Sequence, residues 1–305
     1  MLPTISFILL LTASLAQDKQ INKPQFVGSA PPSVVTVGDS DQSITVAGLT
    51  RTYILHVPPS YNASTRLPLV FVLHGRGGTA ASIENSSGMS AKADQENFIA
   101  VYPAALGDPS VWNTNLSDFS SNGVDDVRFI RALLDKLEND LRIDRRRIYS
   151  CGLSSGAIMS YLLGAKLSDR LAAIGIASGT VGNRAPDGSI RIIPSPSDPV
   201  PVIAFHGKKD GTIYYDGGGS LVDCLSVADS IKFWVNADGC ASSPQKTTEQ
   251  NGNLIIDDYG VCKDGSEVTL YTFINGTHEW PRLQNNDKFS ATDAMWKFFV
   301  NHPRR

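Results

Sequence analysis

The stretch RIYSCGLSSGAIMSYLL, residues 147–163, decides the fold of this chain. Ile148 and Tyr149 are apolar and predict a strand, and the apolar residues from Ile158 onward predict a helix. Between them, GLSSG at 152–156 matches the G-x-S-x-G pattern of a nucleophile elbow, a sharp strand-to-helix turn that exposes a serine. Glycines are expected there because a side chain would collide with the neighbouring strand or helix. The same pattern also occurs by chance, so other parts of the chain must support the assignment.

The length and composition of the chain are those of a globular protein. It has 305 residues, of which 42% are hydrophobic and 19% charged, and its formal net charge is −3. This length suits one large α/β domain or two small ones. No basic cluster is longer than Arg145-Arg146-Arg147. The charge pattern therefore indicates neither nucleic acid nor an anionic membrane surface as a partner.

Residues 1–16, MLPTISFILLLTASLA, resemble a secretory signal peptide. The apolar run Phe7–Leu11 precedes Ser14 and Ala16 at small-residue positions, although only the terminal amine supplies positive charge. A short buried helix is the alternative interpretation, and the run is too short to span a bilayer. Residues 17–40 are polar and rich in Pro, Ser and Gly, which predicts a surface lead-in. We therefore expect a secreted, extracellular protein.

The four cysteines fit an oxidising compartment. Cys240 and Cys262 flank a polar segment and a predicted strand, so we expect a disulfide between them. Cys151 lies inside the elbow and is predicted to be a small buried thiol, whereas Cys224 has no evident partner. No C-x-x-C or H-x-x-x-H spacing occurs, so no structural or catalytic zinc is expected.

Strands and helices alternate from about residue 67 onward, without an internal repeat or a break in composition. This pattern predicts one α/β domain over residues 41–305, with a mostly parallel central sheet and helices on both faces. The clearest strand is LPLVFVL at 67–73, an apolar run typical of a strand covered on both sides. The other predicted strands are 43–46, 51–57, 98–102, the run from 148, 172–177, 202–205, 255–259 and 268–274. The predicted helices are 89–96, 125–141, the segment after the elbow, 227–236 and 291–300.

Three residues form a candidate catalytic triad. In an α/β-hydrolase, the serine, the acid and the histidine follow in this order, each beyond the carboxyl end of a strand. Ser154 lies in the elbow, Asp210 follows the strand that ends at Phe205, and His278 follows the strand that ends at Ile274. An imidazole that accepts the serine proton creates a nucleophile, and a carboxylate holds that imidazole in the required tautomer. We therefore predict the α/β-hydrolase fold with nucleophilic serine chemistry.

Other residues compete for these roles. The remaining histidines are predicted to be structural: His56 within a strand, His302 in the terminal tail, and His74 and His206 before glycines at strand ends. Asp216 and Asp223 compete with Asp210 for the role of the acid, but they lie farther from the strand. Ser155 competes with Ser154, but only Ser154 is the central residue of G-x-S-x-G.

Two backbone amides are candidates for the oxyanion hole, which must supply fixed N–H donors to the developing negative charge. The residue after the nucleophile supplies one donor, and here it is Ser155. The loop after the early strand supplies the other. That loop is HGRGG at 74–78, and we assign the donor to the amide of Arg76.

Two tryptophans are candidate substrate-binding residues. Trp280 follows His278 by two residues, and Trp112 lies in the stretch 106–123, which has little periodicity. Loops of this length in a compact domain tend to be functional. An exposed indole face could hold an aryl group, a sugar or a polyester unit. Core packing is the alternative interpretation for both side chains.

Seven segments carry a family resemblance: LHGRGG (73–78), VYP (101–103), DDVRFI (125–130), GLSSGAIM (152–159), FHGKKD (205–210), THEWP (277–281) and SATDAMWKFF (290–299). In this order they resemble the secreted polyhydroxybutyrate depolymerase / feruloyl esterase group of carbohydrate esterases, from about residue 45 onward. The resemblance implies a cofactor-free serine esterase whose triad and oxyanion amides fall on Ser154, Asp210, His278, Arg76 and Ser155. Arg76 stands where the family often has a small residue or Cys, and Arg282 where Gly is common. The second departure leaves the substrate open.

These features together predict a secreted serine carboxylic ester hydrolase that works through an acyl-enzyme. Its expected substrates are small-molecule or polymer esters of the feruloyl, acetyl-xylan or polyhydroxybutyrate type. We expect a monomer without metal or cofactor, and neither nucleic acid nor a membrane as a partner. A serine peptidase of the same fold is one alternative, disfavoured because no segment reads as a gating domain. A catalytically inactive hydrolase fold used for binding is another, disfavoured because no triad member is missing.

Overall fold

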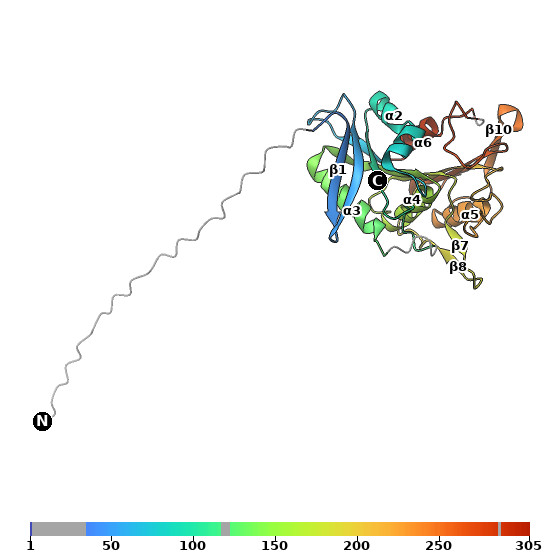
Figure 1. Ribbon diagram of the computed structural model, residues 1–305, viewed down its shortest axis with the longest axis horizontal. Coiled ribbons are helices and arrows are strands. Elements are labelled where there is room, and N and C mark those ends of the chain that lie inside the picture. The colour runs from blue at the N-terminus through green and yellow to red at the C-terminus, as the bar shows by residue number, and fades with distance from the viewer. Residues whose placement is uncertain (2–34, 117–122, 286–287) are drawn as a thin grey trace. The chain divides into compact units, whose positions relative to one another are not determined.

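The computed structural model describes residues 1, 35–116, 123–285 and 288–305. Its centre is a ten-stranded sheet with the strand order β1-β2-β4-β3-β5-β6-β9-β12-β11-β10 (Figure 1). The strands of this sheet are β1 (Gly38–Val46), β2 (Leu49–Val57), β3 (Leu67–Leu73), β4 (Ile99–Pro103), β5 (Ile143–Leu153), β6 (Ala173–Ala177), β9 (Val202–Gly207), β10 (Gln245–Glu249), β11 (Leu254–Val261) and β12 (Glu267–Phe273). A small second sheet pairs β7 (Gly182–Arg184) with β8 (Ile190–Ile192).

The six strands in the middle of the large sheet, from β4 to β12 in spatial order, run parallel. Antiparallel strands flank them, with β1 and β2 at one edge and β11 and β10 at the other. Every residue of β3 is buried, as its unbroken apolar sequence predicts for a strand with both faces covered. The prediction of a mostly parallel central sheet is therefore confirmed.

Helices cover both faces of the sheet (Figure 1). They are α1 (Ala80–Ser87), α2 (Met89–Glu96), α3 (Asp126–Asp140), α4 (Ser155–Lys166), α5 (Val227–Ala237) and α6 (Ala291–Asn301). The apolar sides of α3, α4 and α5 share one core cluster, to which Phe129, Met159 and Trp234 belong. Those of α1, α2 and α6 share the other, with Met89 and Met295 among its members.

Several helices begin at a residue whose side chain accepts a hydrogen bond from a backbone amide of the first turn. Asp125 does so for α3, Ser226 for α5 and Ser290 for α6. These N-caps satisfy donors that have no partner inside the helix, which sets the point where each helix starts. The helix expected to open at the Asp125-Asp126 pair is confirmed.

The parallel strands determine where functional side chains gather. Strands β3, β5, β6, β9 and β12 are neighbours in the sheet. Because parallel strands end at the same edge, the segments that follow their carboxyl ends lie close together. The elbow follows β5, the segment containing Asp210 follows β9, and the segment containing His278 follows β12.

Some expectations differ from the structure. Strand β1 begins at Gly38, inside the predicted lead-in of residues 17–40, because Gly38 already pairs with Val57 of β2. Strand β5 begins at Ile143, five residues before the predicted start at Ile148. The exposed strand β10 was not expected, since all of its side chains are exposed and leave no apolar signal. The predicted signal peptide and most of the lead-in lie outside the described residues.

The cysteines behave as expected where a prediction was made. Cys240 and Cys262 form a disulfide, and Cys151 is a buried free thiol. Cys224, for which no partner was evident, is also buried and free. Within the described residues, none of the helices is both long enough and apolar enough to cross a membrane.

Candidate active site

Ser154 occupies the sharp turn between β5 and α4, and its backbone is strained. Its φ and ψ angles are 58° and −121°, a combination that non-glycine residues rarely adopt. The amide of Ser154 donates to the carbonyl of Ala177 at 3.0 Å, which ties the turn to the neighbouring strand. Its side chain makes no capping hydrogen bond to α4. The turn thus presents a hydroxyl that is not engaged in capping, at an energetic cost typical of functional sites.

The glycines around the turn have the packing role that the sequence predicted. A Cβ atom on Gly156 would lie 2.2 Å from the carbonyl oxygen of Leu73, and one on Gly152 would lie 2.4 Å from the carbonyl carbon of Gly156. Both positions exclude a side chain because the obstacle is backbone. On the other side, a Cβ on Gly75 would lie 3.3 Å from the Cβ of Ser154. The HGRGG loop therefore packs directly against the elbow.

A cavity of about 270 Å³ opens beside this turn. Ser154, Ser155, Arg76 and His278 all contribute to its wall. The structure thus brings together, from three separate loops, four of the residues that the sequence singled out. The remaining wall is mostly apolar and includes Val111, Trp112, Leu116, Ile158, Ile213, Leu221 and Val222. An apolar cavity with a few polar groups at one end is typical of a small-molecule site.

Asp210 lies behind His278 and is held from several directions. Its Oδ2 lies 2.8 Å from Nδ1 of His278, while its Oδ1 accepts the amides of Thr212 at 2.8 Å and Ile213 at 2.9 Å. Burial by itself would raise the pKa of this carboxyl, but hydrogen bonds from His206, His278 and Thr212 outweigh it and hold the pKa well below the usual range. Asp210 is therefore a carboxylate, able to fix the His278 ring and to stabilise its charged form.

The two histidines that were expected to brace loops do so. Nε2 of His74 accepts the amide of Ala105 at 3.0 Å, and its Nδ1 donates to the carbonyl of Gly75 at 2.7 Å. Burial lowers the pKa of His74, in agreement with this neutral tautomer. Nε2 of His206 lies 2.9 Å from the carbonyl oxygen of Ile213 and 3.2 Å from Oδ2 of Asp210. His206 thus fixes the loop and the carboxylate together.

The two tryptophans have different positions. Trp112 is buried in the cavity wall, where its Nε1 donates to the carbonyl of His74 at 2.8 Å. Trp280 does not line this cavity. It is buried in the core cluster that α1, α2 and α6 share, and its Nε1 donates to the hydroxyl of Thr292 in α6 at 2.9 Å. Core packing therefore describes Trp280, and only Trp112 remains a candidate for contact with a substrate.

The cavity also contains residues that the sequence analysis did not identify. Thr180, Gly182 and Asn183 follow β6, and Leu221, Val222 and Cys224 belong to the long segment after β9. No motif marks them. Position is the one available signal for the residues after β6, because β6 is the neighbour of β5 and its carboxyl end must lie beside the elbow.

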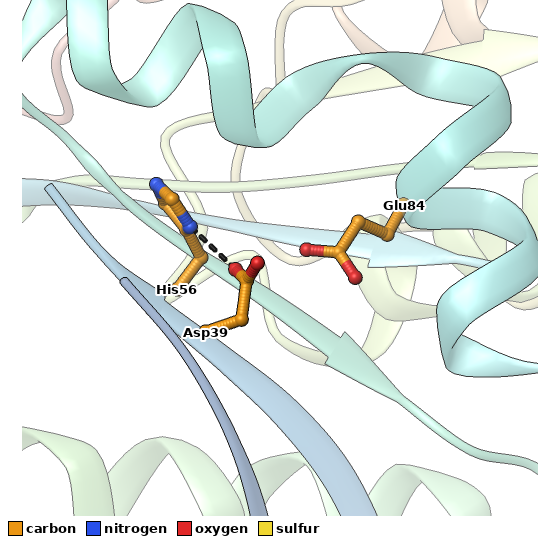
Figure 2. Close-up of side chains that lie close together, drawn as sticks. All are labelled: Asp39, His56 and Glu84. Atoms are coloured by element: carbon orange, nitrogen blue, oxygen red, sulfur yellow. Dashed lines mark hydrogen bonds and ion pairs between the residues drawn. The ribbon is translucent and has the colours of Figure 1, made fainter. Parts of the chain in front are cut away.

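A second cluster of titratable groups lies away from the cavity. Figure 2 shows Asp39 of β1, His56 of β2 and Glu84 of α1, whose ligand-type atoms lie within 4.8 Å of one another. Nδ1 of His56 is 2.5 Å from Asp39, and its Nε2 is 3.0 Å from Asp94 of α2. Burial raises the pKa of Glu84, and the nearby Asp39 adds to this effect. Because both nitrogens of His56 already contact carboxylates, this cluster is a hydrogen-bonded network that joins the edge hairpin to α2.

Comparisons with known proteins show the family and the fold to which this chain is similar. A family model described as "Esterase PHB depolymerase" matches residues 51–263. The chain is 28% identical over 257 residues to feruloyl esterase C of Emericella nidulans, covering 82% of this chain and 84% of that protein. It is 26% identical over 236 residues to feruloyl esterase B of Piromyces equi, covering 75% of this chain and 42% of that protein. Among solved structures, an acetyl xylan esterase from Aspergillus awamori shares the fold with a TM-score of 0.65 at 18% identity, over 86% of this chain and 99% of that one.

Proposed function

Because the chain belongs to the esterase PHB depolymerase family and is therefore a carboxylic ester hydrolase, we propose that it is a secreted serine esterase that works through an acyl-enzyme. The observation that carries this proposal is the hydrogen bond between His278 and the Asp210 carboxylate, next to a cavity whose wall includes the strained Ser154. These groups are the nucleophile, base and acid that ester cleavage by this route requires.

In the proposed reaction, Oγ of Ser154 attacks the carbonyl carbon of the ester while Nε2 of His278 takes the hydroxyl proton. The amides of Arg76 and Ser155 stabilise the resulting oxyanion. The C–O bond to the alcohol then breaks, and His278 returns the proton to the leaving alkoxide. Water repeats the sequence on the acyl-enzyme, releasing the carboxylic acid and regenerating Ser154. Throughout, Asp210 keeps Nδ1 of His278 protonated and stabilises the imidazolium.

The substrate is proposed from the relatives and from the shape of the cavity. The names of the family and of similar proteins suggest three classes of substrate, which are feruloyl, acetyl-xylan and polyhydroxybutyrate-type esters. We propose that the substrate belongs to one of these three classes. Feruloyl and acetyl groups are small acyl groups attached to a polysaccharide chain. In polyhydroxybutyrate the polymer chain itself consists of acyl units. A mostly apolar cavity of about 270 Å³ beside Ser154 suits a small acyl group, so the acyl side of the ester is proposed to enter it.

Secretion is supported by two features. The Cys240–Cys262 disulfide is typical of proteins that fold in an oxidising compartment, and residues 1–16 have the apolar core and small-residue positions of a signal peptide. The intact mass of protein recovered from culture medium tests this point. A mass lacking residues 1–16 is expected, and a full-length mass in the medium contradicts cleavage.

The decisive experiment on the mechanism is Ser154→Ala. We expect it to abolish turnover of p-nitrophenyl acetate and labelling by a fluorophosphonate probe, with a nearly unchanged melting temperature. Ser86→Ala makes the same chemical change on α1, outside the cavity wall, and is the matched control that retains activity. Activity retained by Ser154→Ala would overturn the assignment. Faster cleavage of peptide amides than of esters would favour a peptidase, and a wild type that the probe does not label would favour a binding protein.

A further inference from the structure

Arg51 and Asp126 form a buried ion pair that the proposed reaction does not use. Nη2 of Arg51 in β2 lies 2.6 Å from Oδ1 of Asp126 in α3, and each side chain is only 1% exposed. The guanidinium also packs over the ring of Phe129, 3.9 Å from its centre. A buried ion pair is weak evidence for stability, because the cost of removing two charges from water offsets much of their attraction. The other hydrogen bonds of the two residues indicate a different role.

Each member of the pair holds one end of the segment 104–113. Nη2 of Arg51 donates to the carbonyl of Ala104 at 3.1 Å, where the segment leaves β4. Oδ2 of Asp126 accepts the amide of Asn113 at 2.7 Å, at the other end. The ion pair therefore joins the two ends of the segment through buried side chains.

The segment 104–113 is in turn bound to the HGRGG loop. Four hydrogen bonds join the two, from the amide of Ala105 to Nε2 of His74 (3.0 Å), from Nε1 of Trp112 to the carbonyl of His74 (2.8 Å), from the amide of Gly77 to the carbonyl of Ser110 (2.7 Å) and from the hydroxyl of Ser110 to the carbonyl of Gly78 (2.7 Å). The amide of Arg76, a proposed oxyanion donor, lies between bound residues of this loop. Because Gly75 packs against Ser154, a shift of the loop would move that amide relative to the reacting carbonyl.

We propose that Arg51 and Asp126 are positioning residues for the oxyanion hole: their ion pair fixes the segment 104–113, and this segment holds the amide of Arg76 in place. The inference rests on the proposed esterase function of Ser154. Neither member of the pair lines the cavity. Both therefore act through the loop and not by contact with the substrate.

The expected consequence is a loss of rate and not of substrate binding. Acylation and deacylation both pass through an oxyanion, whereas the bound ester does not carry this charge, so displaced donors destabilise only the transition states. Asp126→Asn keeps the size of the side chain but removes the charge that binds Arg51. We expect it to lower kcat for p-nitrophenyl acetate about 10- to 100-fold, with KM within about threefold of the wild-type value.

A second variant keeps the test valid if Asp126→Asn does not fold. Removing one member of a buried pair leaves the other charge without a partner, which is strongly destabilising. The double variant Arg51→Met/Asp126→Asn removes both charges. It still deprives the carbonyl of Ala104 of its donor, so it should show the same loss of kcat with unchanged KM.

Asp238→Asn is the matched control. Asp238 is also a buried carboxyl that accepts a backbone amide, that of Val200. Val200 precedes β9, whereas the catalytic segment containing Asp210 follows this strand. The control should keep the wild-type kcat per active site, with active sites counted from labelling by a fluorophosphonate probe at completion.

Inhibition by 1,1,1-trifluoro-2-butanone separates positioning from a merely structural role. Oγ of Ser154 adds to the carbonyl carbon of this ketone, the hydroxyl proton passes to Nε2 of His278, and the carbonyl oxygen becomes an oxyanion at the same donors. The inhibition constant does not depend on the amount of folded protein. In both variants we expect it to rise by about the same factor by which kcat/KM falls.

A reduced kcat with an unchanged inhibition constant would show a loss of folded protein alone and would overturn the inference. Either variant, if folded and as active as the wild type, would overturn it as well. In both cases hydrolysis by the wild type leaves the proposed function standing. If instead the wild type does not hydrolyse p-nitrophenyl acetate, or Ser154→Ala retains activity, the proposed function itself fails.

Discussion

Nδ1 of His278 lies 2.8 Å from Oδ2 of Asp210, and Oδ1 of the same carboxylate accepts two backbone amides. Both oxygens of Asp210 are thus occupied, and its side chain is fully buried. The carboxylate cannot rotate away from the imidazole without giving up these bonds. It therefore sets both the orientation and the tautomer of His278.

The first prediction concerns this hydrogen bond. Asp210→Asn keeps the size of the side chain but replaces a carboxylate with a neutral amide that favours the wrong tautomer of His278. We expect kcat for p-nitrophenyl acetate at pH 8 to fall by roughly 10³- to 10⁴-fold. The circular dichroism spectrum should stay that of the wild type. A loss of less than tenfold with an intact fold would show that Asp210 is not the acid of the triad.

The second prediction concerns backbone strain at Ser154. Its φ of 58° is unfavourable for any residue with a Cβ but not for glycine. Ser154→Gly should therefore be about 1 kcal/mol more stable than Ser154→Ala, although both are expected to be inactive. Chemical denaturation of the two variants measures the difference directly. Equal stabilities would indicate that the turn holds no strain at this residue.

The third prediction concerns the close approach of Gly156 to β3. A methyl group at this position would lie 2.2 Å from the carbonyl oxygen of Leu73, and a backbone atom cannot move aside without disturbing the sheet. Gly156→Ala should cost about 3 kcal/mol or more in the free energy of unfolding, or prevent folding. Gly211→Ala is the matched control, since a Cβ atom on Gly211 would have nothing within 4 Å. Similar stabilities of the two variants would contradict the packing role of Gly156.

The fourth prediction concerns stability at different pH values. Burial raises the pKa of Asp238 to about 7, against hydrogen bonds from Ser266 and the amide of Val200. Between the unfolded value of 3.8 and about pH 7, the folded protein keeps this proton while the unfolded chain releases it. The unfolded chain then binds fewer protons, so Asp238 lowers the free energy of unfolding as pH rises through this window. The full effect is on the order of 4 kcal/mol.

Asp238→Asn removes this titration, because an amide carries no charge at either pH. The variant should therefore lose less stability than the wild type between pH 4.5 and 7.5, as measured by urea denaturation. Well above pH 7 the difference should become constant, since the wild-type side chain is then ionised in both states. Parallel stability curves for the two proteins across this window would rule out a titration of Asp238 on folding.

The strand–turn–helix of the elbow, the positions of Asp210 and His278 after their strands, and the central strands could be predicted because each of them leaves a local pattern in the sequence. The apolar run at 67–73 indicates a buried strand, and the G-x-S-x-G spacing at 152–156 indicates a strand-to-helix turn, and both signals can be read from a short stretch of chain. Strand β10 could not be predicted from an apolar pattern, because all of its residues are exposed. Strand β1 starts earlier than its apolar residues indicate, because pairing with β2 extends it to Gly38.

The class of fold, the serine in the elbow and the chain order of Ser154, Asp210 and His278 can be read from the amino-acid sequence, because each depends on a local pattern or on order along the chain. The residues that line the cavity depend on the three-dimensional packing: Trp112 and Asn183 lie in its wall, while Trp280 packs in the core. The physical reason is that a cavity wall is assembled from loops that follow different strands. Which side chains meet there depends on how the whole sheet and its helices pack.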